Sequence, residues 1–181
     1  MAKLKKANIL IVDDIENNLI ALEHALDDLP AKIYKAKSGE EALRLIIGIE
    51  FALVLLDVQM PGMDGFETAE LMRKNRYTET VPIIFVTAIS KEKVHVFKGY
   101  QSGAVDYLFK PIDEHVLRSK VQIFLNLYYQ KTQRLTGILS DLQQTKTELE
   151  RRNQELSLLA THDVLTDLPN RRQLEDDLNR C

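Results

Sequence analysis

Four of the strands predicted in this chain of 181 residues end in side chains that could bind a cation or a phosphoryl group. These side chains are Asp13 and Asp14 after residues 8–12, Asp57 after 51–56, Thr87 after 81–86 and Lys110 after 105–109. Magnesium ions prefer oxygen ligands, and hydroxyl and ammonium groups can bind phosphoryl oxygens. The set therefore suits phosphoryl transfer that is assisted by Mg²⁺.

Asp57 is the strongest candidate for a reacting group. Six apolar residues precede it directly, and turn-forming residues follow from Pro61 to Gly65. An acid at the mouth of a buried strand is costly unless water, a cation or a chemical role accounts for it. Beside a bound cation, such a carboxylate can attack phosphorus and form an acyl phosphate. Thr87 and Lys110 could then donate hydrogen bonds and positive charge to the phosphoryl oxygens.

Each of these residues also has an ordinary structural interpretation. A lone Asp57 would most often be a solvated loop residue, Thr87 a strand-end threonine and Lys110 a surface amine. The functional interpretation depends on their common position, because ligands of parallel α/β sheets bind beyond the carboxyl ends of the strands. Solvated residues scattered along a chain would not gather at that one edge.

The elements that would position these side chains follow from the apolar periodicity. Five strands are expected at residues 8–12, 32–37, 51–56, 81–86 and 105–109. Helices are expected at about 19–29, 38–49, 65–75 and 90–103, and a long helix is expected from Asp113. Ser38 and Glu41 have the spacing of a capping box. Alternating strands and helices predict the α/β class, with a doubly wound, five-stranded parallel sheet and a long C-terminal helical extension.

Composition and charge narrow the class of protein. Hydrophobic residues make up 45% of the chain, which is enough for a sizeable core, and a formal net charge of −3 argues against a nucleic-acid-binding surface. The single cysteine is Cys181, so no disulfide can form within one chain. The N-terminal apolar run at 7–12 is too short for a signal peptide or a membrane span. We expect a cytoplasmic protein that binds neither nucleic acid nor membrane.

Residues 7–128 resemble a response-regulator receiver domain, the phospho-acceptor module of two-component signalling. The resemblance is carried by Val-Asp-Asp at 12–14, Leu-Asp-Val-Gln-Met-Pro-Gly-Met-Asp-Gly at 56–65, Thr-Ala at 87–88 and Lys-Pro at 110–111. It implies that a histidine kinase or a phosphotransfer protein supplies the phosphoryl group. The fold expected with it is flavodoxin-like, with the strand order 2-1-3-4-5.

The resemblance also implies roles for the acidic residues. Asp57 would be the phosphorylated residue. Asp14, Asp57 and the backbone carbonyl of Gln59 would bind Mg²⁺, with Asp13 nearby. Gln59 stands at a position that varies in the family and tunes dephosphorylation, as does Ile89, so the lifetime of the phosphoryl group stays open.

Three further positions match the family's pattern. Thr87 and Lys110 would contact the phosphoryl group. Tyr107 would be the switch aromatic, which turns inward when the threonine moves. The peptide bond between Lys110 and Pro111 is usually cis in this family. The resemblance therefore predicts a site that senses phosphorylation as well as accepting it.

The long helix after Asp113 carries a leucine repeat. Four leucines recur every seven residues, and they are Leu135, Leu142, Leu149 and Leu156. With these at heptad position d, position a is occupied by Leu139, Lys146, Asn153 and Ala160. Leucine at d with polar residues at a favours a parallel two-stranded coiled coil. The alternative is a solvated helix whose leucine stripe packs on its own domain. We expect a homodimer through this helix, with a receiver face as a second contact.

Residues 161–172 resemble the opening motif of GGDEF domains, the diguanylate cyclase family, although Asp167 stands where glycine is commoner. The sequence ends before that family's signature, metal-binding acids and nucleotide pocket. We therefore expect no enzyme activity from this chain, and we expect a fragment of a longer regulator or a truncated one. Its output would be a diguanylate cyclase or a GGDEF–EAL protein. The expected domains are a receiver at 1–128, a coiled-coil linker helix at 129–160 and the start of a GGDEF domain at 161–181.

The function expected from the sequence is a phosphorylation-controlled switch. The state of Asp57 would be relayed through a dimeric helix to a cyclic di-GMP output domain. Two alternatives stay open. A phosphohydrolase with an aspartate nucleophile would need a second acid two residues later, where Gln59 stands. A dimerisation module that works without phosphorylation would not need the intact acidic set.

Overall fold

A computed structural model of the chain describes residues 6–88 and 106–161, with side chains as far as residue 156. The chain divides into two compact units, Met1–Gln130 and Lys131–Cys181. The helix expected at 90–103 lies outside the described residues, and so does the motif expected to open a GGDEF domain, apart from the backbone of its first residue.

The first unit is built on a five-stranded parallel sheet with the strand order β2-β1-β3-β4-β5. The strands are β1 (Ala7–Val12), β2 (Ala31–Ala36), β3 (Leu53–Asp57), β4 (Ile83–Thr87) and β5 (Asp106–Phe109). The helices are α1 (Glu16–Ala25), α2 (Gly39–Gly48), α3 (Gly65–Lys74) and α5 (Glu114–Thr161). The predicted fold class and strand order are confirmed.

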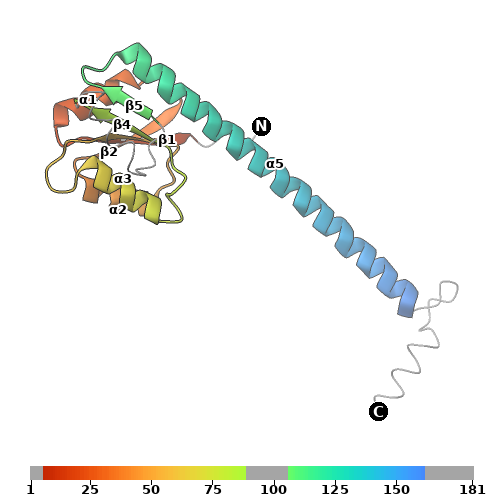
Figure 1. The fold of residues 1–181 in the computed structure, drawn as a ribbon. Helices are drawn as coiled ribbons and strands as arrows, with labels where there is room; N and C mark the ends of the chain where they lie inside the picture. Colours follow the sequence, from red (N-terminus) through yellow and green to blue (C-terminus); the bar gives the residue numbers. More distant parts are fainter. Residues whose placement is uncertain (1–5, 89–105, 162–181) are drawn as a thin grey trace. The chain divides into compact units, whose positions relative to one another are not determined.

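Two hydrophobic cores lie on opposite faces of this sheet. Figure 1 shows α2 and α3 on one face, and α1 with the first part of α5 on the other. Successive residues of β1 alternate between the cores, because side chains of a strand point to opposite faces. Ile9 and Ile11 pack beneath α1 and α5, whereas Leu10 and Val12 pack beneath α2 and α3. This double burial explains the unbroken apolar runs in the sequence.

Two strands begin later than their apolar runs predict. Phe51 and Ala52 are buried, but β3 begins at Leu53 and continues through Asp57. Similarly, β4 begins at Ile83, because Pro82 has no N–H to donate to the ladder and only accepts from the amide of Val54, at 3.0 Å. Burial and strand pairing are therefore not the same signal. Asp57 and Thr87 become the last residues of their strands.

The first helix is shorter than its leucine spacing predicts. A helix continuing to Leu29 was expected, but α1 ends at Ala25. The amide of Leu26 donates to the carbonyl of Glu23, and that of Leu29 to Leu26, so the chain continues in tight turns. Aspartates at positions 27 and 28 have low helix propensity. Leu26 is still buried, which is why the spacing looked helical.

The helix caps near the site are formed differently from the expectation. The Ser38 hydroxyl accepts from the amide of Glu41 at 3.2 Å, but the Glu41 carboxylate accepts from Lys37 instead of closing the box on Ser38. The complete capping box is at α3, where the side chain of Asp64 accepts from Glu67 at 2.8 Å and Glu67 accepts from the amide of Asp64 at 3.2 Å. It fixes the start of α3, directly after the loop that follows Asp57.

Helix α5 belongs to both units. Asp113 caps it as predicted, because its side chain accepts from the amides of His115 and Val116. Within the first unit α5 buries Leu117, Val121 and Leu125. Within the second unit its leucines are exposed in this single chain, at 51% for Leu135, 63% for Leu142, 58% for Leu149 and 63% for Leu156. In the part of the chain that the structure describes, no helix is long and apolar enough to cross a membrane.

The capping box at α3 gives a testable expectation. Replacement of Asp64 by alanine should lower the free energy of unfolding by about 1 kcal/mol, because the backbone amide of Glu67 loses its partner. Urea denaturation followed by circular dichroism would measure the loss. As a control, Glu70→Ala removes only an exposed ion pair with Lys74 and should cost no more than a few tenths of a kcal/mol. Equal losses in the two variants would contradict the role of the cap.

Candidate functional site

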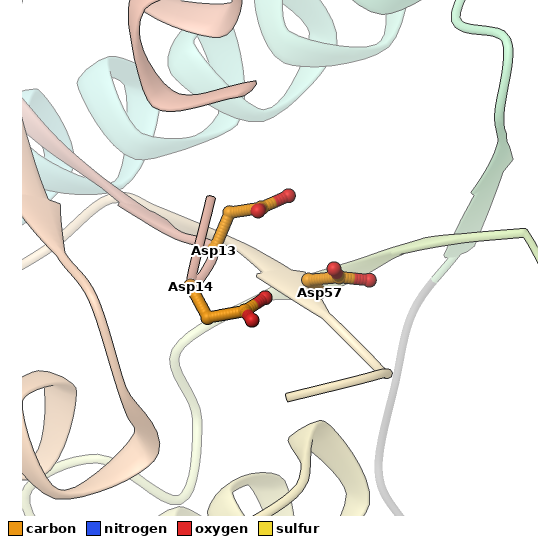
Figure 2. Close-up of side chains that lie close together, drawn as sticks. All are labelled: Asp13, Asp14 and Asp57. Carbon is orange, nitrogen blue, oxygen red and sulfur yellow. The ribbon is translucent and has the colours of Figure 1, made fainter. Parts of the chain in front are cut away.

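Three carboxylates meet at the carboxyl edge of the sheet. Asp13 and Asp14 follow β1, and Asp57 ends β3. The strands are direct neighbours, with Val12 opposite Leu56, so their ends bring the acids together. Each acid offers an oxygen atom, and these atoms lie within 4.8 Å of one another. Figure 2 shows the three side chains converging at this edge.

Lys110 joins two of these carboxylates. It follows β5, and its backbone amide donates to the carbonyl of Thr87 at 2.9 Å, which fixes its place beside β4. Its Nζ lies 2.9 Å from Oδ2 of Asp13 and 2.9 Å from Oδ2 of Asp57. Burial disfavours the charged ammonium, but the hydrogen bonds and charges of the two aspartates outweigh it and raise the pKa of Lys110. The lysine therefore stays charged. Its peptide bond to Pro111 is cis, as expected.

The carboxyl group of Asp57 is poorly stabilised in its charged form. Asp57 is only 4% exposed, and burial raises its pKa above the ordinary value. The hydrogen bond and charge of Lys110 act in the opposite direction, and the nearby charge of Asp13 adds to the rise. Without a further cation, one ammonium group does not offset the burial and mutual repulsion of the acids.

Asp13 and Asp14 have unequal hydrogen-bond partners. Asp13 is wholly buried, and its oxygens accept from the amide of Ile15, from the side chain of Asn18 and from Lys110. By contrast, Oδ1 of Asp14 is buried and has no hydrogen-bond partner among the described residues. A buried, unpartnered carboxylate oxygen beside the oxygens of Asp57 is what a hard cation such as Mg²⁺ requires. The residues present therefore fit the predicted metal.

The loop after Asp57 is held close to it. The amide of Gln59 lies 3.3 Å from Oδ1 of Asp57, and the amide of Gly65 donates to the carbonyl of Val58 at 3.1 Å. A Cβ atom at Gly65 would lie 2.2 Å from the backbone oxygen of Asp57, so any side chain there would displace the loop. Gly62 has φ of +78°, a conformation that favours glycine. These glycines allow the loop to fold back under the acid.

Thr87 and Tyr107 lie on the two strands beyond Asp57. Thr87 is wholly buried at the end of β4 and pairs with Phe109 of β5. Tyr107 is half-buried, and its ring centroid lies 5.5 Å from that of Phe85. Both residues thus belong to the half of the sheet that carries Lys110. The four leucines of the repeat belong to the second unit.

Sequence reasoning missed two residues that shape the site. Asn18 lies in the first turn of α1 and bonds both oxygens of Asp13. A polar side chain one helical turn after a strand-end acid was the available signal. The sequence predicts only a turn at Gly65, whereas the structure shows that its lack of a side chain permits the close approach to Asp57. No pattern of spacing reveals that contact.

Comparison with known proteins identifies relatives over most of the first unit. The family model described as "Response regulator receiver domain" matches residues 9–122. The Vibrio cholerae protein named "Probable cyclic di-GMP phosphodiesterase" is 35% identical over 156 residues, which cover 86% of this chain and 34% of that protein. "Response regulator PleD" of Caulobacter vibrioides is 37% identical over 116 residues, covering 64% of this chain and 25% of that protein.

Solved structures show the same fold. The chemotaxis response regulator CheY4 of Vibrio cholerae superposes with a TM-score of 0.61 at 30% identity, and covers 66% of this chain and 99% of its own. The chain thus spans nearly all of a single-domain relative. It spans about a third and a quarter of the two longer relatives.

The raised pKa of Asp57 predicts a pH-dependent gain in stability on its neutralisation. The unfolded state has a pKa of about 3.9, so the folded state binds the proton more tightly and loses stability as the pH rises through the higher, folded pKa. Asp57→Asn avoids this cost, while Lys110 keeps its bond to Asp13. Without Mg²⁺, the variant should be more stable at pH 7.5, by on the order of 1 kcal/mol, a usual size for one substitution.

Urea denaturation at several pH values between 4 and 8 would measure this effect. The advantage of Asp57→Asn should be small at pH 4 and largest near neutrality. The matched control is Asp27→Asn, which neutralises an exposed aspartate of the same unit. A variant that is less stable than the unaltered chain at neutral pH would contradict the cost assigned to Asp57.

Proposed function

Because this chain belongs to the response regulator receiver family, we propose that it accepts a phosphoryl group on Asp57 from a phosphohistidine donor and acts as a switch. The donor would be a histidine kinase or a phosphotransfer protein. The observation that carries the proposal is the position of Lys110. Its ammonium group bridges Asp57 and Asp13 beside the unpartnered oxygen of Asp14.

The proposed reaction is a nucleophilic displacement at phosphorus. A carboxylate oxygen of Asp57 forms the new O–P bond while the P–N bond to the donor imidazole breaks, and the leaving nitrogen takes up a proton. Lys110 can donate to an incoming phosphoryl oxygen, because its charge is maintained and it already lies 2.9 Å from Asp57. We assign to the hydroxyl of Thr87, at the end of the adjacent strand, the second donor to the phosphoryl group.

Receiver domains bind Mg²⁺ at their acidic pocket. In this chain we propose that Asp14, Asp57 and the backbone carbonyl of Gln59 hold the ion, while Asp13 lies nearby. The unpartnered oxygen of Asp14 supports this division, since the oxygens of Asp13 are already taken up by protein donors. When bound, the ion supplies positive charge that offsets the repulsion among the acids and the phosphoryl oxygens.

The switch would pass through β4 and β5. In the proposed mechanism Thr87 moves toward the phosphoryl group, and Tyr107 takes an inward position. Tyr107 is only half-buried, and its ring lies beside that of Phe85, which is compatible with such a movement. An equilibrium between two arrangements, shifted by phosphorylation, is sufficient for this response.

The alternative as a phosphohydrolase has less support. Such an enzyme would need a second acid at the position of Gln59, whose amide side chain cannot donate or accept a proton as a carboxyl group does. A dimerisation module independent of phosphorylation is also disfavoured, because it would not require three converging carboxylates and a bridging lysine. Both alternatives predict no stable phosphoryl group on Asp57.

The output is proposed from the relatives and from the second unit. Two relatives are named as a response regulator and as a cyclic di-GMP phosphodiesterase, and both extend well beyond the matched segment. We propose a receiver at 1–128, a linker helix at 129–160 and the start of a GGDEF domain at 161–181. We propose that the signal received by this output concerns cyclic di-GMP.

The linker helix is proposed to form a parallel coiled coil with a second copy. Its seam would contain the exposed leucines Leu135, Leu142, Leu149 and Leu156. Burying such side chains contributes about 1.5–3 kcal/mol each when the burial is complete. Lys146 and Asn153 at the a positions weaken the coil and fix its register. The dimer would therefore be responsive to changes in the receiver.

The phosphoryl acceptor can be tested directly. Incubation with phosphoramidate and Mg²⁺ should add the mass of one phosphoryl group to the intact chain, and Asp57→Asn should remove this labelling. Intact-mass spectrometry is the measurement. Asp27→Asn, which alters an exposed aspartate, should label normally. Labelling of the Asp57→Asn variant to the same extent would show that the acceptor is misassigned.

The seam can be tested by introducing charge. Leu142→Lys combined with Leu149→Lys would place like charges against each other in the dimer and should make the chain monomeric. Sedimentation equilibrium over a range of concentrations is the measurement. The control is Gln144→Lys with Gln154→Lys, which adds the same charge away from the seam and should leave the dimer intact. An unaltered chain that is monomeric at high concentration would end the dimer proposal.

A further inference from the structure

The side-chain amide of Asn18 holds the carboxylate of Asp13. Its Nδ2 lies 2.9 Å from Oδ1 and 3.0 Å from Oδ2 of Asp13. Two further donors reach this carboxylate, namely the amide of Ile15 at 2.9 Å and Nζ of Lys110 at 2.9 Å. Asp13 is wholly buried, so these protein donors stand in for water.

The three donors differ in whether they can keep their hydrogen bond to Asp13 during phosphoryl transfer. The amide of Ile15 is backbone and is fixed at the start of α1. Lys110 also bonds Asp57, and under the proposed function it must turn toward the phosphoryl oxygens. Among the described donors, Asn18 is then the one that still bonds Oδ2 of Asp13. Asp13, Asn18 and Lys110 all line a cavity of about 450 Å³, so the lysine is not enclosed on every side.

We propose that Asn18 is a positioning residue for phosphoryl transfer, a role that rests on the proposed function. It acts through Asp13 and does not touch the phosphoryl group. By bonding both oxygens it keeps the carboxylate in one orientation, so that Lys110 can leave without exposing an unpartnered, buried oxygen. That cost is large for a charged group, and without Asn18 it would hold the lysine on Asp13.

A purely structural role for Asn18 makes a different prediction. The N-cap of α1, Ile15, has no side chain that could bond the first amides of the helix. Asp13 accepts from the amide of Ile15 instead. In a purely structural role, Asn18 would hold Asp13 in place only to stabilise the start of this helix. Its loss would then lower the melting temperature and leave the reaction at saturating Mg²⁺ unchanged. Rate and stability must therefore be measured separately.

The experiment compares the full chain with Asn18→Leu, which keeps nearly the same size and removes both hydrogen bonds. Labelling by phosphoramidate is followed by intact mass at a series of Mg²⁺ concentrations, which gives a maximal rate and a half-saturating concentration. The maximal rate should fall about tenfold, the scale of one hydrogen bond to a charged group, with the half-saturating concentration little changed. Asn17→Leu, at the exposed neighbouring position, should label as the unaltered chain does.

A wild-type maximal rate in Asn18→Leu, with or without a lower melting temperature, would overturn the inference. So would an unchanged rate with a raised requirement for Mg²⁺. If Asn18→Leu does not fold, Asn18→Ala decides, because it removes the donor without adding a charge or a bulky apolar group beside Asp13, and a wild-type rate there has the same meaning. Failure of the unaltered chain to be labelled at all would instead refute the proposed function.

Discussion

The convergence of two buried carboxylates and a third, partly exposed one beside a single ammonium group is the constraint on which the first unit depends. Lys110 bridges Asp13 and Asp57, yet the pKa of Asp57 is still raised, so the cluster is not neutralised by the protein alone. Such an arrangement costs stability, because buried charges are stable only when they are fully paired. The parallel sheet supplies the surroundings that hold it, since the ends of β1, β3 and β5 are fixed by two hydrophobic cores.

The backbone around Asp57 also serves to hold the charged groups together. The loop after β3 returns so closely that Gly65 leaves no room for a side chain, and the capping box at Asp64 fixes α3 directly after it. These contacts hold Asp57 close to the other acids, although they repel it. The same turn residues that shape the loop therefore also keep the charged groups of the site close together. Relaxing the loop would lower the repulsion and would also disperse the groups that bind a cation.

The sequence predicted the sheet and the acids because both depend on strong local signals. Apolar runs located β1, β3 and β4, and ligands of parallel sheets bind at the carboxyl ends of the strands, where the acids stand. The strand order was expected from the resemblance to receiver domains. What could not be predicted depends on tertiary contacts. Phe51 is buried without pairing in the ladder, and Glu41 bonds Lys37 in preference to its own cap. Asn18 bonds Asp13 across the boundary between a strand and a helix. Neither the strand period nor the helix period predicts a contact across such a boundary.

Under the proposed function, the signal must leave the cluster through a short stretch of chain. Lys110, whose partners change, precedes the start of α5 at Glu114 by four residues, and Tyr107 precedes it on β5. A phosphoryl group adds about −1.5 to −2 charges, and coupling energies between sites are typically about 1–3 kcal/mol. A coil with leucine at every seam position would be too stable to respond to so small a coupling energy. In the proposed coil, Lys146 and Asn153 would reduce the stability to a range that the receiver can influence.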